Sequence, residues 1–149
     1  MIKTYKGKIT ALLPNQIFVF GSNTEGRHGK GAALYAKEHF GAVQGMSQGR
    51  QGMSYAIVTK DLNATTQPSK SKYHIINEIC GLYTYAENHP LLEFLIAYSA
   101  GTRNLCGYSS EVLASFFSYY TIPPNIVFEE GFAKLLKAPK PVGGTNGGD

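Results

Sequence analysis

Four short apolar runs constrain the fold of this chain more than any other feature. They do not alternate apolar and polar residues, and glycine, proline or polar residues bound each of them. Runs of this kind are typical of strands buried on both faces, as in a parallel sheet. We therefore predict four buried strands, at residues 17–20, 55–58, 94–98 and 125–128.

Helix-like stretches lie between these runs. Residues 111–120 carry apolar side chains at helical spacing, and Ser109 just before them offers an N-cap oxygen. Residues 32–40 and 75–86 form the other two predicted helices, with a strand near 73–76 as an alternative because isoleucines lower helix propensity. This alternation predicts an α/β fold with three layers, α/β/α, around a central, mostly parallel mixed sheet.

The length of the chain fits one domain. Its 149 residues include 43% hydrophobic ones, which are enough for a single packed core. We assign residues 1–136 to this domain. Residues 137–149 lack apolar side chains that could pack and end in glycines, so we expect a flexible C-terminal tail.

Charge and hydropathy narrow the range of partners. The net charge of +4 is scattered along the chain, which fits an anionic ligand and nucleic acid equally well. Lys3, Lys6 and Lys8 interrupt any signal-like run, and no apolar stretch is long enough to cross a bilayer. We expect a cytoplasmic protein with no membrane partner.

A glycine-rich loop, GSNTEGRHGKG at 21–31, joins the first predicted strand to the first helix. It brings free backbone N–H groups and the positive end of a helix to the carboxyl edge of the sheet, where open α/β folds hold phosphates. The loop contains neither GxxxxGK[ST] nor GxGxxG, which argues against a Walker-type triphosphate site. The candidate ligand-binding residues in this loop are Gly21, Ser22, Asn23, Gly29, Lys30 and Gly31.

A second loop, SAGTRNLCGY at 99–108, follows the third predicted strand and also leads into a helix. It has the same topological position as the first loop. Two such turns at one sheet edge would suit a diphosphate with a sugar on each side. The candidate ligand-binding residues here are Gly101, Thr102, Arg103, Asn104, Gly107 and Tyr108.

Three segments in this order resemble the macrodomain-like family of bacteria and their phages. They are FVFGSN at 18–23, GRHGKGAA at 26–33 and SYAIVTKD at 54–61, within a likeness that runs from about residue 7 to 136. The family contains ADP-ribose-binding and ADP-ribose-1″-phosphate phosphatase-like proteins. The resemblance implies the family's fold and a ligand of that chemical class.

The resemblance also implies roles for single residues. Asn23 would contact the distal ribose, and Gly29, Lys30 and Gly31 would form the first phosphate loop. Residues 99–108 would form the second phosphate loop, and Phe128 would stack on the adenine ring.

One position departs from the family pattern. The family opens with Gly-Asp-Ile-Thr, in which the Asp accepts a hydrogen bond from the adenine amino group, whereas residues 7–10 here read Gly-Lys-Ile-Thr. Lys8 has no acceptor to offer that amine. A different base, or a site that uses Asp61, is the alternative.

The resemblance implies binding of ADP-ribose or a related nucleotide, free or on an ADP-ribosylated protein. If the protein is also a hydrolase, it would remove a phosphate or a protein adduct from the distal ribose, with Asn23 and His28 as catalytic candidates. Each residue also has an alternative interpretation. His28 could be only solvated or bind a phosphate, and Asn23 could stabilise its own turn by a side-chain hydrogen bond. We expect no cofactor and no metal. A nucleic-acid-binding protein and a catalytically silent interaction protein remain the alternatives.

Overall fold

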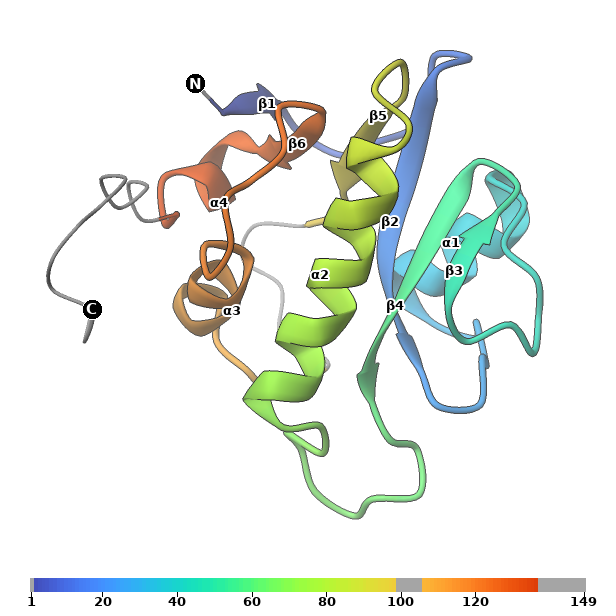
Figure 1. Ribbon diagram of the computed structural model, residues 1–149. Helices are drawn as coiled ribbons and strands as arrows, with labels where there is room; N and C mark the ends of the chain where they lie inside the picture. The colour runs from blue at the N-terminus through green and yellow to red at the C-terminus, as the bar shows by residue number, and fades with distance from the viewer. Residues whose placement is uncertain (1, 99–105, 137–149) are drawn as a thin grey trace, which may run out of the picture.

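The computed structural model describes residues 2–98 and 106–136. It contains one six-stranded sheet in the order β1-β6-β5-β2-β4-β3, in which only β3 and β4 pair antiparallel (Figure 1). The prediction of an α/β fold with a mostly parallel mixed sheet is confirmed. The predicted tail at 137–149 lies outside the described residues. The strands are β1 (Lys3–Tyr5), β2 (Gln16–Asn23), β3 (Gly49–Gln51), β4 (Ser54–Lys60), β5 (Glu93–Ile96) and β6 (Ile126–Glu129).

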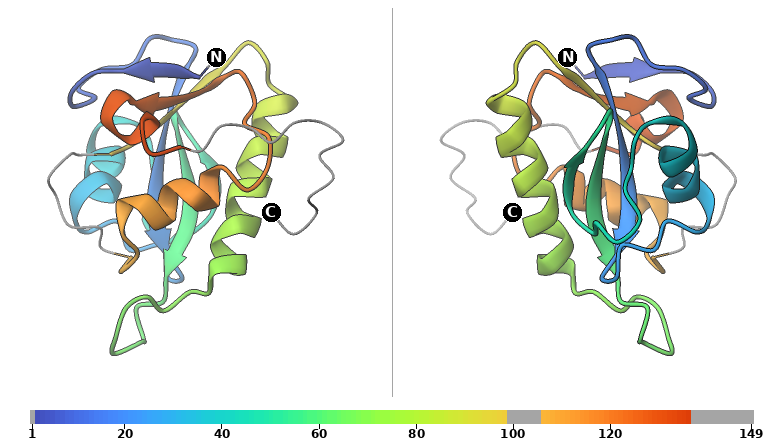
Figure 2. Two further views of the ribbon diagram at one scale, coloured as in Figure 1. Left: turned by 90° about the vertical axis from the view of Figure 1, so that its left-hand side faces the viewer. Right: turned by 90° about the vertical axis from the view of Figure 1, so that its right-hand side faces the viewer.

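Helices cover both faces of this sheet. Figure 2 shows α1 on one side of β2 and β4, and α2 on the opposite side. No helix in the described part of the chain is long and apolar enough to cross a membrane. The helices are α1 (Gly31–His39), α2 (Lys72–Glu87), α3 (Ser110–Phe117) and α4 (Glu130–Ala133).

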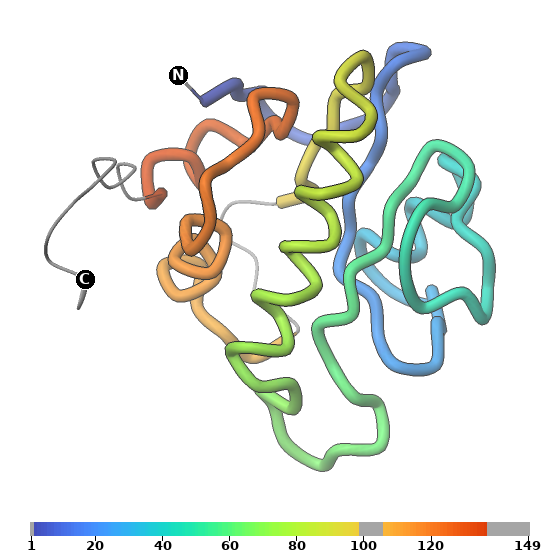
Figure 3. Tube along the Cα trace, viewed as in Figure 1, coloured from blue at the N-terminus to red at the C-terminus, as the bar shows by residue number. Residues whose placement is uncertain are grey.

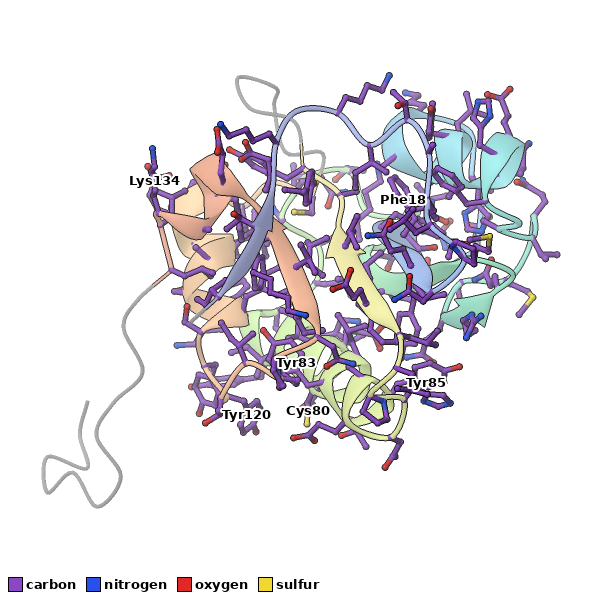
Figure 4. The ribbon with its side chains drawn as sticks, turned by 90° about the horizontal axis from the view of Figure 1, so that it is seen from above. Phe18, Cys80, Tyr83, Tyr85, Tyr120 and Lys134 are labelled. Carbon is purple, nitrogen blue, oxygen red and sulfur yellow. The ribbon has the colours of Figure 1, made fainter. Side chains whose placement is uncertain are left out.

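Strand β2 explains why the sheet needs helices on both faces. Its side chains alternate between faces, so Phe18 and Phe20 pack with α1, while Ile17 and Val19 pack with α2 and α3. All four are at most 4% exposed, which matches the prediction of a strand buried on both sides. Figure 4 shows Phe18 on the α1 side of the sheet, away from the side chains of α2.

Serine caps define where two of the helices start. The Ser71 side chain accepts a hydrogen bond from the backbone N–H of His74 at 3.2 Å, and α2 begins at Lys72. The alternative of a strand near 73–76 is therefore wrong. Ser109 accepts from the Val112 N–H at 3.2 Å in the same way, so the predicted cap of α3 is confirmed.

Three short elements escaped sequence-based prediction. Strands β1 and β3 have three residues each and α4 has four, too few to show a periodic pattern. The two strands are polar in sequence, KTY and GRQ, and exist because a longer neighbour offers backbone partners. Strand β1 places Tyr5 opposite Glu129 of β6, where Tyr5 lines a cavity at the carboxyl ends of the neighbouring strands.

A single buried amide joins α2 to the strands that follow it. Asn125, which is 7% exposed, lies just before β6, and its Nδ2 group contacts three backbone carbonyls. These are the carbonyl oxygens of Ala86 at 2.9 Å, His89 at 3.1 Å and Leu92 at 2.9 Å. The contacts satisfy the last turn of α2 and the loop that leads into β5.

We expect Asn125→Ala to lower the free energy of unfolding by about 1–3 kcal/mol, because it removes the buried side-chain donor that the Ala86, His89 and Leu92 carbonyl oxygens share. Urea denaturation followed by circular dichroism measures this change. The matched control is Asn63→Ala on the exposed loop after β4, which should shift the unfolding free energy by less than about 0.5 kcal/mol. Equal stability of the two variants would contradict the assigned role of Asn125.

Candidate functional site

A cavity of about 520 Å³ lies at the carboxyl ends of β2 and β5. Gly21 of β2 and Ala97 just after β5 both line it, and the strands are parallel neighbours. After β2 the chain continues into α1, which packs on one face of the sheet, and after β5 it continues into α3, which packs on the other face. Strand order reverses at this point, and open α/β sheets bind ligands at such switch points. The volume is within the range of small-molecule sites, roughly 300–1,000 Å³.

The N-terminus of α1 forms one wall of the cavity. Lys30, Gly31 and Ala32 all line it. Lys30 is the N-cap residue and makes no side-chain capping bond, whereas α2, α3 and α4 are capped by Ser71, Ser109 and Glu129. Gly31 has a φ of +54°, an angle that glycine adopts without strain. The helix that faces the cavity thus has no acceptor of its own for its first N–H groups, which favours an anion there.

Two lysines give the cavity a positive charge. Lys8 and Lys30 line it, and neither has an ion-pair partner among residues 2–98 and 106–136. The part of the wall that the structure describes contains no Asp or Glu side chain. Lysine ammonium groups without a nearby carboxylate attract anionic ligands.

Aromatic side chains supply much of the remaining wall. Tyr5, Tyr35, Tyr98 and Phe132 line it, with the rings of Tyr98 and Phe132 5.0 Å apart. The Tyr5 hydroxyl donates to the carbonyl oxygen of Ile96 at 2.7 Å. Burial raises the pKa of Tyr5 well above its ordinary range, opposed by the Tyr98 backbone and reinforced by the Glu129 charge. Tyr5 therefore stays protonated at neutral pH and fixes β1 against the end of β5.

Asn23 lies at the end of β2 and is 7% exposed, and it does not line the cavity. Its Nδ2 group donates to the Arg27 carbonyl oxygen at 2.8 Å. Its Oδ1 accepts from the N–H groups of Arg27 at 2.9 Å and Glu25 at 3.3 Å. The side chain therefore stabilises its own turn, as one of the two sequence-based interpretations expected. The contact with a distal ribose stays a prediction.

His28 is completely buried and also lies away from the cavity wall. Its Nε2 is 3.1 Å from the Met46 carbonyl oxygen, which only accepts, so Nε2 carries the proton. The ring meets Phe20 edge to face at 5.2 Å. Its backbone N–H donates to Gln44 Oε1 at 3.0 Å. His28 thus joins the 24–30 loop to the 41–48 loop, and this position gives no support to a role in proton transfer to a substrate.

Three further candidates of the first loop region take other positions. Ser22 is buried, and Gly29 is exposed with open space around it, but neither lines the cavity. Asp61 follows β4, where its Oδ1 accepts from the Asn63 N–H at 2.9 Å. Of the residues proposed for this region, only Gly21, Lys30 and Gly31 are part of the cavity wall.

Phe128 has no exposed surface. Its ring lies 5.5 Å from that of Phe117 and 5.8 Å from that of Phe132, inside the core on the α3 side of the sheet. A ring with no exposed face cannot stack on a ligand in this conformation. Phe132, on which it packs, lines the cavity in its place.

The second loop is described only in part. Gly101, Thr102, Arg103 and Asn104 lie outside the described residues. Gly107, with φ at +90°, packs so closely on the loop after β4 that an added Cβ would lie 2.6 Å from the Pro68 nitrogen. The Tyr108 hydroxyl donates to the Lys70 carbonyl oxygen at 2.7 Å in the same region. The trace in Figure 3 shows the 61–71 loop running from the end of β4 to the start of α2. Both residues thus contact the 61–71 loop.

Several residues of the wall were not candidates in the sequence. Tyr5, Tyr35, Thr59 and Tyr98 come from four different elements or their ends, and no motif connects them. Only Lys8 could be noticed in the sequence, since it stands where the family that the chain resembles has an Asp.

Comparison with protein-family models, curated proteins and solved structures found no match. No metal-binding cluster of His, Cys, Asp or Glu occurs in the described part of the chain.

We expect Asn23→Ala to lower the free energy of unfolding by about 1–3 kcal/mol, because two loop N–H groups lose their acceptor. Chemical denaturation measures this loss. Thr24→Ala, at the neighbouring exposed position, is the control and should have little effect. Unchanged stability of Asn23→Ala together with lost nucleotide binding would instead favour the direct ribose contact.

Proposed function

We propose that this protein binds ADP-ribose or a closely related nucleoside diphosphate derivative in the cavity at the carboxyl ends of β2 and β5. The observation that carries the proposal is the uncapped N-terminus of α1, which faces a cavity at the topological switch point. Dinucleotide pyrophosphates bind in this setting in other α/β folds. The sequence resemblance to macrodomain-like proteins supports the same class of ligand.

The cavity wall combines lysines with aromatic rings, which suits a ligand that has a charged diphosphate between a base and a sugar. Gly21, Lys30 and Gly31 would contact the diphosphate, since they combine close backbone approach with a positive charge. Tyr35 lies on the α1 side of the cavity, and Tyr98 with Phe132 on the α4 side. These rings offer apolar surfaces for a base and a sugar.

The proposal is binding without hydrolysis. The two catalytic candidates from the sequence, Asn23 and His28, are both buried in loop contacts away from the wall. Within the described wall the titratable side chains are lysines, tyrosines and Cys106, with no carboxylate or imidazole to move a proton at neutral pH. The cavity geometry therefore supports a nucleotide-binding module over a hydrolase.

Calorimetric titration of the full chain tests the proposal. We expect ADP-ribose to bind at least tenfold more tightly than AMP, about 1.4 kcal/mol, because AMP fills only part of the cavity. A short RNA is included as the competing class of ligand. Equal affinity for ADP-ribose and AMP, or tighter binding of the RNA, would contradict the proposal.

A glycine substitution locates the binding in the same titration. An added Cβ at Gly21 would lie 3.1 Å from Thr59 Oγ1, and both residues line the cavity. Gly21→Val should therefore narrow the cavity and weaken ADP-ribose binding at least tenfold. Gly81→Val on the exposed side of α2, away from the cavity wall, is the matched control and should leave the affinity unchanged.

A further inference from the structure

Lys8 and Tyr35 meet at the wall of the cavity. Lys8 lies in the connection between β1 and β2, and Tyr35 lies in α1. Both residues line the cavity, and the Lys8 Nζ atom is 5.0 Å from the centroid of the Tyr35 ring. A cation at this distance from an aromatic face is attracted by the ring. The pair therefore places an ammonium group beside an aromatic surface at the cavity wall.

The Tyr35 ring is held in place by its surroundings. Its hydroxyl donates to the Thr10 carbonyl oxygen at 3.4 Å, and its ring packs on Phe18 at 6.2 Å and on Phe40 at 5.6 Å. The Lys8 ammonium group has no hydrogen-bond acceptor among the residues that the structure describes. Its capacity to donate is thus available to a ligand.

The charged side chains of the described wall, Lys8 and Lys30, are both donors. The described wall contains no Asp, Glu, Asn, Gln or His side chain. The Tyr5 and Thr59 hydroxyls already donate to the backbone carbonyl oxygens of Ile96 and Ser22, so a ligand donor can pair with these two oxygens but not with Lys8. An ammonium group has three N–H donors and no acceptor. If an amino group of the ligand faced Lys8, the N–H donors of both groups would point at one another without an acceptor. Unpaired donors in a partly closed site weaken binding.

We propose that the base of the nucleotide presents a ring carbonyl to Lys8, as 6-oxopurines and uracil do, and not an exocyclic amine as adenine does. This inference rests on the proposed function, since it assigns the base of the nucleotide in that same cavity. Tyr35 supplies the aromatic surface beside the base, and Lys8 donates to the carbonyl oxygen. Lys8 is then the residue that determines base specificity.

A matched pair of ligands tests this directly. ADP-ribose and its hypoxanthine counterpart, inosine diphosphate ribose, differ at the base only in an amine replaced by a carbonyl and the accompanying ring proton. We expect the full chain to bind the hypoxanthine compound at least tenfold more tightly in calorimetric titration. Uridine diphosphate ribose, as a third ligand, distinguishes a purine from a pyrimidine carbonyl.

Two variants assign the preference to Lys8. Lys8→Met should abolish the tenfold difference, while Lys37→Met, which removes an exposed lysine of α1 outside the cavity wall, should preserve it. Equal or tighter binding of ADP-ribose by the unmodified protein would overturn the inference. So would a preference that survives Lys8→Met, or an equal loss of both ligands, which would place Lys8 on a phosphate. Binding of none of the three ligands would instead defeat the proposed function.

Discussion

The pairing of β2 with a parallel neighbour on each side is the constraint on which the rest of the domain depends. Its backbone bonds to β5 and β4, and its side chains fill the cores on both faces of the sheet. Because β2 lies inside the sheet, its carboxyl end opens between the helices that cover the two opposite faces. The cavity is the space that this arrangement leaves open, and its polarity follows from the backbone groups that converge there.

Polar side chains of the first loop stabilise the framework of the site. Asn23 and His28 bond to loop backbone, and Gly45 donates to the Gly26 carbonyl oxygen at 2.8 Å. These contacts fix the path from β2 to α1 and so aim the uncapped helix end at the cavity. The polar side chains in the described wall are instead mostly tyrosines, Lys8 and Thr59 from other segments, together with Lys30 of this loop.

Much of the fold could be predicted from the sequence, and part of the site. The apolar runs identified β2, β4, β5 and β6 because full burial of a strand leaves a continuous hydrophobic signature. Gly21, Lys30 and Gly31, which line the cavity, could be named as candidates because a glycine-rich loop before a helix presents free backbone N–H groups. The roles of Tyr5 and Tyr35 could not be predicted, since tertiary packing alone brings β1 and α1 to one cavity. Likewise, composition cannot tell whether a loop histidine points outward or, like His28, into the core.

Backbone amide shifts measured by NMR during titration with ADP-ribose test the central claim, that a nucleotide binds at the carboxyl ends of β2 and β5. We expect the largest shifts at Gly21, Gly31 and the first turn of α1, with little change at Gly81 in α2. Shifts confined to another surface, such as the exposed pair Tyr119 and Tyr120, would contradict the assignment of this cavity as the binding site.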